Sequence, residues 1–228
     1  MGNRRIWELD LLRTLAIILM ITFHTVFDLN NYVGINIKYQ SGFWFWEGKI
    51  SALLFIFLAG ISSGFSKGTV RRGIKVFLFG MAITLVTYIL FGEQYTRFGI
   101  LHLLGVGMAL FPVLKRINNI FLFLMTVIFA FAAIPVKHVL AETGLLLPFG
   151  IMYSGFATLD YYPLVPYLSV FILGVLVYKL FYYKRQSIFT FDYKNKYLSL
   201  ISRNSLAIYL IHQPIIIALI SLILIMYN

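Results

Sequence analysis

The sequence predicts an all-α, polytopic membrane protein, a helical bundle with about seven transmembrane helices. Of its 228 residues, 61% are hydrophobic and only 12% are charged, whereas soluble domains average about 45–50% apolar and about 25% charged residues. The mean hydropathy of +0.88 indicates more apolar surface than one soluble core of this size can bury. The length favours one domain over residues 1–228 rather than two.

Seven apolar runs are long enough to cross a bilayer, which takes about 20 residues, or about 17 at the short end. They cover residues 11–29, 50–66, 73–91, 98–114, 118–135, 163–182 and 204–226. The first run is too long for a cleavable signal peptide and contains Arg13 and His24, so we expect none. No internal repeat of the kind found in many transporters is visible in the sequence.

The charges between these runs predict the orientation of the chain. With the N-terminus in the cytoplasm, fourteen Lys and Arg residues fall in cytoplasmic segments and four in outer segments. The cytoplasmic set is Arg4, Arg5, Lys67, Arg71, Arg72, Lys75, Lys115, Arg116, Lys179, Lys184, Arg185, Lys194, Lys196 and Arg203, and the outer set is Lys38, Lys49, Arg97 and Lys137. Cytoplasmic loops are enriched in Lys and Arg, so we expect the N-terminus inside and the C-terminus outside. The same bias explains the net charge of +11 without nucleic acid as a partner.

Two outer segments are long, at residues 30–49 and 136–162, and both are rich in glycine and aromatic residues. Glycines and Pro148 interrupt the apolar stretch 144–160. Such a segment can re-enter a bundle only where protein or water covers its backbone, and the sequence leaves this question open.

The first helix carries four ionisable residues, Asp10, Arg13, His24 and Asp28, within a sector of roughly 60°. A cation near the cytoplasmic end therefore shares a face with an imidazole about 16 Å further along the axis. Ionisable groups inside a membrane cost about 2.5–3.5 kcal/mol each and persist where they pair or do chemistry. We expect Asp10 to pair with Arg13, and Asp28 to orient His24. In the structural alternative, Arg13 reaches the headgroups and His24 makes one interhelical bond.

Three further candidates lie in later spans. His102 is in the outer half of the fourth span, level with His24, where a neutral imidazole suits a proton relay or a substrate contact. His212 and Gln213 precede Pro214, which removes a backbone hydrogen bond and is expected to kink the helix. In the structural alternative, His102 is a satisfied buried histidine, and the other two side chains bond the freed carbonyls.

Asp160 and Glu47 are the acidic candidates of the outer face. Asp160 precedes the sixth span and Pro163, so it either contacts substrate or caps that helix. Glu47 follows an aromatic cluster before the second span. The small-residue stretch 59–64 is explained by close helix packing. Four histidines and no cysteines favour the absence of a metal site, and we predict none.

Several of these segments resemble known membrane acyltransferases. Arg13, ten residues and then His24 match the hallmark of the first helix in the acyltransferase-3 type. Residues 97–105, 160–167 and 203–214 are more similar to the catalytic domain of heparan-α-glucosaminide N-acetyltransferase and its short bacterial relatives. The larger members have ten or more spans, so the glycan in their name does not carry over to this shorter chain.

The resemblance implies an enzyme of a prokaryotic plasma membrane. It would transfer an acetyl or other small acyl group from cytoplasmic acyl-CoA to an extracytoplasmic glycan or small molecule, at an amine or a hydroxyl group. Arg13, held by its partner Asp10, would meet the phosphates of the coenzyme at the cytoplasmic side, together with the loop cations Arg71, Arg72, Lys75 and Arg203.

The resemblance also implies roles in the chemistry. His24 would be the general base, Asp28 or His102 would orient His24 or the acceptor, and His102 or a backbone amide would stabilise the oxyanion. The residues expected to contact the acceptor are Asp160, His212, Gln213 and Glu47. Direct transfer and an acyl-histidine intermediate both stay open, as does a homodimer.

Two other classes of function stay open. A transporter or channel for a small anion or a proton-coupled solute would use the same polar face as its pathway, and a scaffold would do no chemistry. Flux into liposomes without acyl-CoA would favour the transporter, and failure to bind CoA would favour the scaffold.

Overall fold

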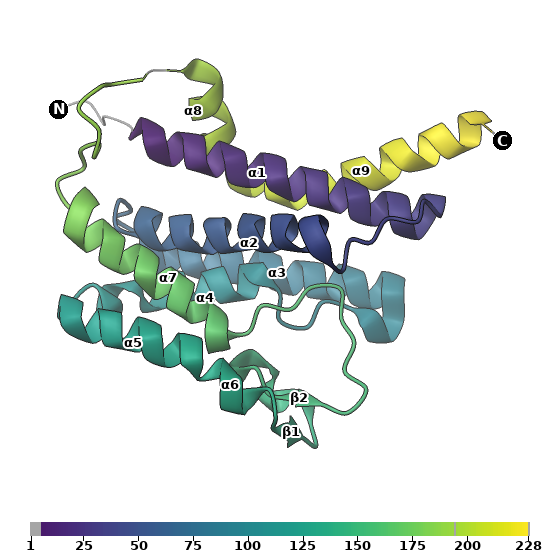
Figure 1. The fold of residues 1–228 in the computed structure, drawn as a ribbon, viewed down its shortest axis with the longest axis horizontal. Helices are drawn as coiled ribbons and strands as arrows, with labels where there is room; N and C mark the ends of the chain where they lie inside the picture. The colour runs from purple at the N-terminus through teal and green to yellow at the C-terminus, as the bar shows by residue number, and fades with distance from the viewer. Residues whose placement is uncertain (1–5, 194, 228) are drawn as a thin grey trace. The chain divides into compact units, whose positions relative to one another are not determined.

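The computed structural model describes residues 6–193 and 195–227, and within them almost all regular structure is helical (Figure 1). Arg4, Arg5 and Lys194, expected in the cytoplasm, lie outside the described residues. The elements are α1 (Trp7–Asp28), the π-helical η1 (Leu29–Val33), α2 (Gly42–Ser63), α3 (Thr69–Phe91), η2 (Gly92–Gln94), α4 (Ile100–Leu114), α5 (Asn119–Phe131), α6 (Ala133–Val136), β1 (Leu140–Ala141), η3 (Gly144–Phe149), β2 (Met152–Tyr153), α7 (Leu164–Val177), the π-helical η4 (Tyr178–Tyr182), α8 (Lys196–Arg203) and α9 (Ser205–Tyr227). The all-α fold class predicted from the sequence is confirmed.

Six of the described helical segments are long and apolar enough to cross a membrane. They are Trp7–Val33, Gly42–Ser63, Thr69–Gln94, Asn119–Val136, Leu164–Tyr182 and Ser205–Met226. The remaining expected span, residues 98–114, forms α4, which is apolar but only 15 residues long, or about 22 Å. The hydrocarbon core of a bilayer is about 30 Å thick. The chain is an integral membrane protein, and whether α4 crosses completely stays a prediction.

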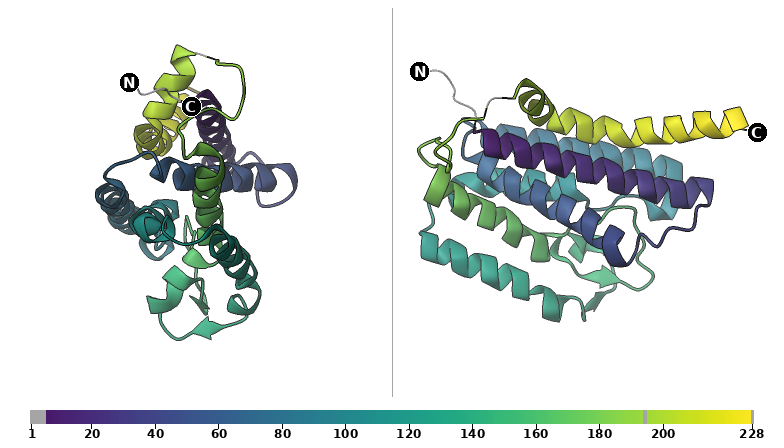
Figure 2. Two further views of the ribbon diagram at one scale, coloured as in Figure 1. Left: turned by 90° about the vertical axis from the view of Figure 1, so that its left-hand side faces the viewer. Right: turned by 45° about the horizontal axis from the view of Figure 1, so that its top comes forward.

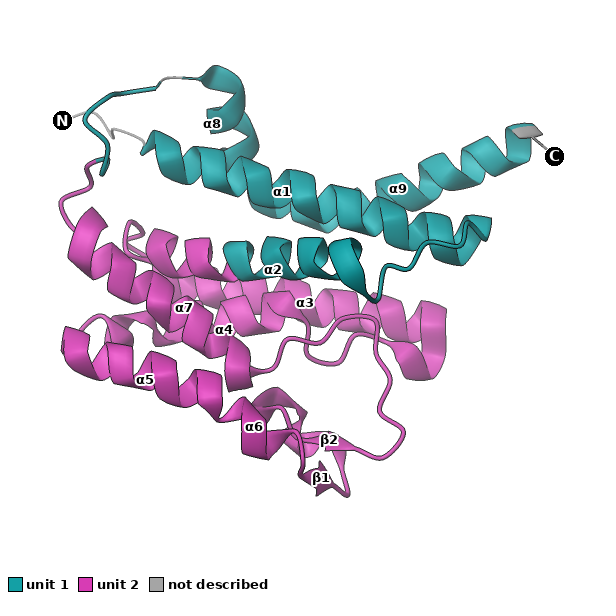
Figure 3. Cartoon of the chain, in the orientation of Figure 1, with its two compact units in different colours: residues 1–55, 187–228 teal, residues 56–186 magenta. Residues whose placement is uncertain are grey.

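The contacts within the chain divide it into two compact units (Figure 3). The described part of unit 1 comprises residues 6–55, 187–193 and 195–227, and unit 2 comprises residues 56–186. Helix α2 passes from one unit to the other after Phe55. A single domain over residues 1–228 stays a prediction.

In unit 1, α1 lies alongside α9 and contacts α8 (Figures 1 and 2). Leu9, Ile17 and Met20 of α1 are buried apolar residues. The Ser51 hydroxyl in α2 donates a hydrogen bond of 3.0 Å to the backbone carbonyl of Ala16 in α1. The first half of α2 therefore packs on the same helix that carries the polar face predicted from the sequence.

In unit 2, α3 lies beside α4, and α5 lies beside α7 (Figure 2). Gly60 of α2 faces the backbone of Phe171, and Gly174 of α7 faces the backbone of Phe57, so neither glycine has room for a Cβ atom. This close approach confirms the helix packing predicted for the small residues at 59–64.

The long segment 136–162 also belongs to unit 2, and backbone hydrogen bonds tie it to the connection between α3 and α4. The N–H groups of Leu159 and Tyr162 donate to the carbonyls of Gln94 and Phe98 at 3.0 and 2.9 Å. Strands β1 and β2 pair in parallel within this segment. These bonds place Asp160 beside the start of α4, and re-entry of the segment into a membrane stays a prediction.

Candidate active site

Two histidines meet between α1 and α9 in unit 1. The imidazole rings of His24 and His212 have their centroids 4.8 Å apart, edge to face. The rings of the two helices are thus in direct contact. His102, which the sequence places level with His24, lies in unit 2, and a meeting of the two histidines stays a prediction.

The hydrogen bond of His212 fixes its tautomer. Its Nδ1 atom lies 2.6 Å from the carbonyl oxygen of Tyr209, and because a carbonyl can only accept, Nδ1 carries the hydrogen. In the neutral ring the other nitrogen, Nε2, is then an acceptor, and it is buried without a hydrogen-bond partner. Pro214 frees the carbonyl of Leu210, four residues earlier. The bond of His212 to Tyr209 therefore does not match the structural alternative, in which His212 bonds the freed carbonyl.

Asp28 and Gln213 form the second pair between α1 and α9. The Gln213 side-chain amide donates to both carboxylate oxygens of Asp28, at 2.8 and 2.9 Å, and Asp28 is fully buried. A carboxylate accepts only, so the amide nitrogen must face it. The carbonyl oxygen Oε1 of Gln213 is left buried without a partner. The role of Asp28 in orienting His24 stays a prediction, whereas its bond to Gln213 was not foreseen.

Glu47 in α2 is a third buried acceptor of unit 1. The residue is 6% exposed, and neither carboxylate oxygen has a hydrogen-bond partner. Glu47 is one turn from Ser51, which bonds the backbone of α1, and it is next to Gly48, which packs on the ring of Phe23. Glu47 therefore belongs to the face of α2 that packs on α1 near His24.

The buried polar atoms without partners in this part of unit 1 are all of one kind. Nε2 of His212, Oε1 of Gln213 and the carboxylate of Glu47 accept hydrogen bonds when the carboxylate is ionised. Leaving a buried polar group unpaired costs about 1–3 kcal/mol. A bound molecule with N–H or O–H groups would recover that cost.

A separate polar cluster occupies the N-terminal part of α1. The Arg13 guanidinium donates to the Ser202 hydroxyl of α8 at 2.6 Å, and that hydroxyl donates to the Asp10 carboxylate at 2.7 Å. The Arg13 and Asp10 groups lie 3.8 Å apart, as the sequence predicted. Ser202 was missed, because its only signal in the sequence is its position next to Arg203.

Between the two polar clusters, α1 presents apolar side chains. Ala16, Ile17 and Met20 are 0%, 3% and 5% exposed. They fill the stretch of helix that separates Arg13 from His24. A cavity that joins these two residues stays a prediction, and along this face of α1 it would require the packed side chains to move.

His102 stands in a closed environment at the first turn of α4 in unit 2. Its Nδ1 accepts from the Gly99 N–H at 3.1 Å, and its Nε2 lies 3.4 Å from the Thr84 hydroxyl. The rings of Phe77 and Phe98 pack on it, and it is 2% exposed. Both ring nitrogens have partners, which favours the structural alternative over a catalytic role.

Asp160 caps a different helix from the one expected. Its Oδ2 accepts a hydrogen bond of 3.1 Å from the backbone N–H of Ile100, at the start of α4. The helix that follows Asp160 in the sequence, α7, begins after Pro163 with no side-chain cap. Burial raises the pKa of Asp160 to about 6, although the bond to Ile100 lowers it. A contact of this residue with substrate stays a prediction.

The remaining candidates are exposed cations, Arg71 and Arg72 in α3 and Arg203 at the end of α8. Exposure leaves their guanidinium groups accessible to anions. Among the described residues, no three His, Cys, Asp or Glu side chains gather in a group that could hold a metal ion.

Comparison with known families adds one finding. The family described as "Heparan-alpha-glucosaminide N-acetyltransferase, catalytic" matches residues 5–214. That match includes the polar clusters of α1, the start of α4 and the buried acceptors His212 and Gln213. No curated protein and no solved structure matches the chain.

Proposed function

The chain belongs to the family of the heparan-α-glucosaminide N-acetyltransferase catalytic domain, and from this premise we propose that it moves an acetyl or other small acyl group across the membrane. The donor is cytoplasmic acyl-CoA, and the acceptor is an extracytoplasmic amine or hydroxyl, preferably on a sugar. The membrane is the plasma membrane of a prokaryote.

The observation that carries this proposal is the set of buried acceptors near the histidine pair. Nε2 of His212, Oε1 of Gln213 and the carboxylate of Glu47 have no hydrogen-bond partners. Amines and hydroxyls, the groups that an acyltransferase modifies, are the donors that such acceptors bind. The site therefore suits an acceptor molecule with several N–H or O–H groups.

In the proposed reaction, His24 is the general base. A nitrogen of its imidazole removes a proton from the acceptor amine or hydroxyl, whose nitrogen or oxygen bonds to the thioester carbonyl carbon. The carbon–sulfur bond then breaks, and the sulfur leaves with the electron pair. The proton passes from His24 to that thiolate, so the products are the acylated acceptor and free CoA.

The neighbours of His24 position the acceptor rather than take its proton. His212 accepts a second hydrogen bond at Nε2, because Tyr209 holds the hydrogen on the other nitrogen. Gln213 and Glu47 accept further bonds. Asp28 keeps the amide of Gln213 turned toward itself, so that Oε1 faces the acceptor. Arg13, Arg71, Arg72 and Arg203 attract the phosphates of the coenzyme.

Acyl transfer with purified variants tests these roles. With acetyl-CoA and glucosamine as substrates, His24→Ala should lower kcat at least about 100-fold, the usual minimum for loss of a general base. His212→Ala should mainly raise the KM for glucosamine. His138→Ala, in the exposed segment after α6, serves as a control with wild-type kinetics.

The histidine variants also separate the alternatives. Wild-type turnover by His24→Ala would end the proposed mechanism. Loss of turnover in His212→Ala with normal turnover in His24→Ala would exchange the roles of the two residues. Solute flux into liposomes without acyl-CoA would instead support a transporter.

A further inference from the structure

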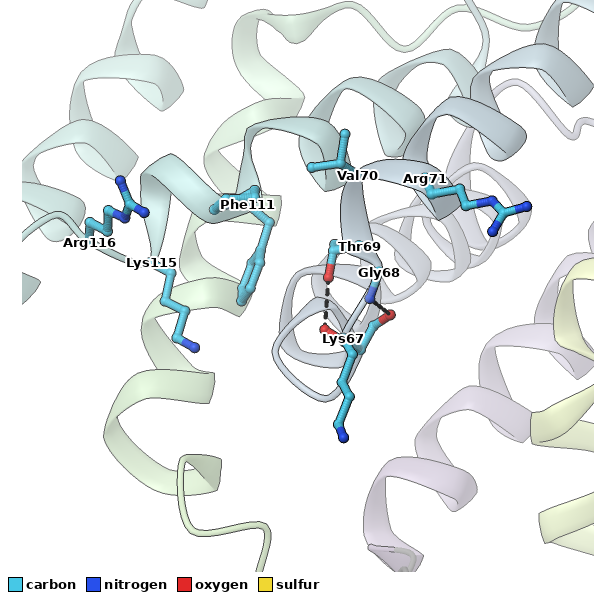
Figure 4. A pocket seen from close by; sticks show the side chains of 10 residues that line it. Lys67, Gly68, Thr69, Val70, Arg71, Phe111, Lys115 and Arg116 are labelled. Atoms are coloured by element: carbon cyan, nitrogen blue, oxygen red, sulfur yellow. Dashed lines mark hydrogen bonds between the residues drawn. The ribbon is translucent and has the colours of Figure 1, made fainter.

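A cavity of about 460 Å³ lies in unit 2 between the start of α3 and the end of α4 (Figure 4). Four cations contribute to its lining, Lys67 and Arg71 from the first of these segments and Lys115 and Arg116 from the second. Phe111, which is buried, forms an apolar part of the wall. The cavity thus combines a high positive charge with a hollow of small-molecule size.

Few carboxylates of unit 2 are available to balance this charge. Unit 2 contains three acidic residues, Glu93, Glu142 and Asp160. Glu93 follows the far end of α3, which is 23 residues long, and Asp160 caps the far end of α4. None of the ion pairs among the described residues includes a cation of the cavity. Unlike Arg13, none of these four cations forms an ion pair with a carboxylate among the described residues.

The backbone at the start of α3 adds donors to the same hollow. The N–H groups of the first helical turn have no acceptors within a helix, and here they belong to Thr69, Val70 and Arg71, all of which line the cavity. The N-cap residue, Gly68, provides no side-chain cap. The start of a helix carries a partial positive charge, so the backbone and the side chains attract the same kind of ligand.

The enrichment of cations in cytoplasmic loops explains part of this arrangement. That rule accounts for four basic residues, and the carbonyls at the end of α4 favour Lys115 and Arg116 nearby. Neither effect explains why a cavity lies between the start of α3 and the end of α4. In Figure 4, the Lys67 and Lys115 side chains extend toward the same side of the cavity, whereas Arg71 and Arg116 extend away in opposite directions.

We propose that this cavity binds a phosphate group between the ammonium groups of Lys67 and Lys115, with Phe111 as its apolar wall. Lysine binds phosphate as a compact point charge. The phosphate belongs either to the nucleotide part of acyl-CoA or to the headgroup of an anionic phospholipid. The coenzyme source rests on the proposed function, whereas the lipid source does not.

Binding measurements on the purified full chain distinguish these sources. One arm titrates adenosine 3′,5′-bisphosphate into detergent-solubilised protein by calorimetry. The second arm measures by native mass spectrometry how much phosphatidylglycerol stays bound after extraction from mixed phosphatidylcholine nanodiscs. Lys67→Gln/Lys115→Gln should weaken one of the two ligands at least about tenfold, and Lys67→Arg/Lys115→Arg should restore its binding.

The matched control is Lys184→Gln/Lys196→Gln, which removes two exposed cations that are not part of the cavity lining. It should bind both ligands as the wild type does. Loss of nucleotide binding alone assigns the cavity to the coenzyme, and loss of lipid binding alone assigns it to the headgroup. Unchanged binding of both ligands by the folded Gln variant overturns the proposal. Because neither arm measures turnover, failure here is distinct from failure of acyl transfer.

Discussion

At the scale of single residues, two effects act in opposite directions on the pKa of Asp160. The Ile100 N–H bond favours the charged form, and packing against Gly99 and the surrounding segment removes water. Removal of water is the larger effect, so the pKa of Asp160 rises from 3.8 to about 6. The folded state then binds the proton more tightly than the unfolded chain does. Stability contributed by this group is therefore full below pH 3.8 and falls as the pH rises to about 6.

Replacement of Asp160 by Asn should remove this pH dependence. The Asn side chain keeps an oxygen that can accept from Ile100 but does not titrate. At 1.36 kcal/mol per pKa unit, the wild type should lose at most about 3 kcal/mol between pH 3.8 and 6. Thermal unfolding across that range measures the difference. Glu142→Gln, an exposed acid of the same unit, should respond as the wild type does, and an equal response in Asp160→Asn would refute the assignment.

The sequence identified most polar candidates because a charged or imidazole group stands out in an apolar run. It could not assign their roles, because those depend on neighbours distant in the chain. His102 and His212 look alike in sequence, yet the first has partners for both nitrogens and the second has a free Nε2. Gln213 and Asp28 are 185 residues apart, and only the packing of α9 on α1 joins them.

At the scale of helices, α2 and α7 approach through glycine. Gly60 faces the backbone at Phe171, and Gly174 faces the backbone at Phe57. Backbone atoms cannot swing aside as a flexible side chain can. The close contact of the two helices therefore depends on the absence of a Cβ atom at both positions.

Gly60→Ala or Gly174→Ala should each lower stability by roughly 1–3 kcal/mol, the usual cost of forcing extra atoms into a packed site. Gly144→Ala is the matched control, since a Cβ atom there would meet its nearest neighbour at an ordinary 3.4 Å. Melting in detergent compares the three variants. If Gly60→Ala has the same melting temperature as the control and the wild type, then α2 and α7 do not pack as described.

The helices themselves were largely predictable, since long apolar runs mark them. The exact start of α4 and the residue that caps it could not be predicted from the sequence. The run 98–114 is apolar throughout, but the helix begins only at Ile100, where the distant Asp160 accepts the first N–H. The pairing of Phe98 with Tyr161 brings that cap into place, and no local pattern encodes it.

For the whole molecule, the orientation in the membrane is a prediction that labelling of introduced cysteines tests. The fourteen cations expected inside against four outside favour a cytoplasmic N-terminus. The chain has no cysteine, so a thiol reagent reacts only with a cysteine that is introduced by substitution. Its labelling shows on which side of the membrane that position lies.

Gln186→Cys and Thr143→Cys place the label in exposed segments on opposite predicted sides. A membrane-impermeant maleimide should label Thr143→Cys in intact cells. It should label Gln186→Cys only after the cells are permeabilised. The reverse pattern would place the N-terminus outside, and cytoplasmic acyl-CoA would then not reach the end of α1 that carries Arg13.

The buried side chains of Ala16, Ile17 and Met20 affect how easily ions could leak across the membrane along α1. Protons and ions travel along chains of water, and this stretch of α1 provides no polar groups to support one. A protein can then keep charged chemistry near each surface of an energised membrane without draining its electrochemical gradient through that helix. In the proposed reaction, the acyl arm of the coenzyme would have to pass this barrier, and the side chains would have to close again behind it to keep ions out.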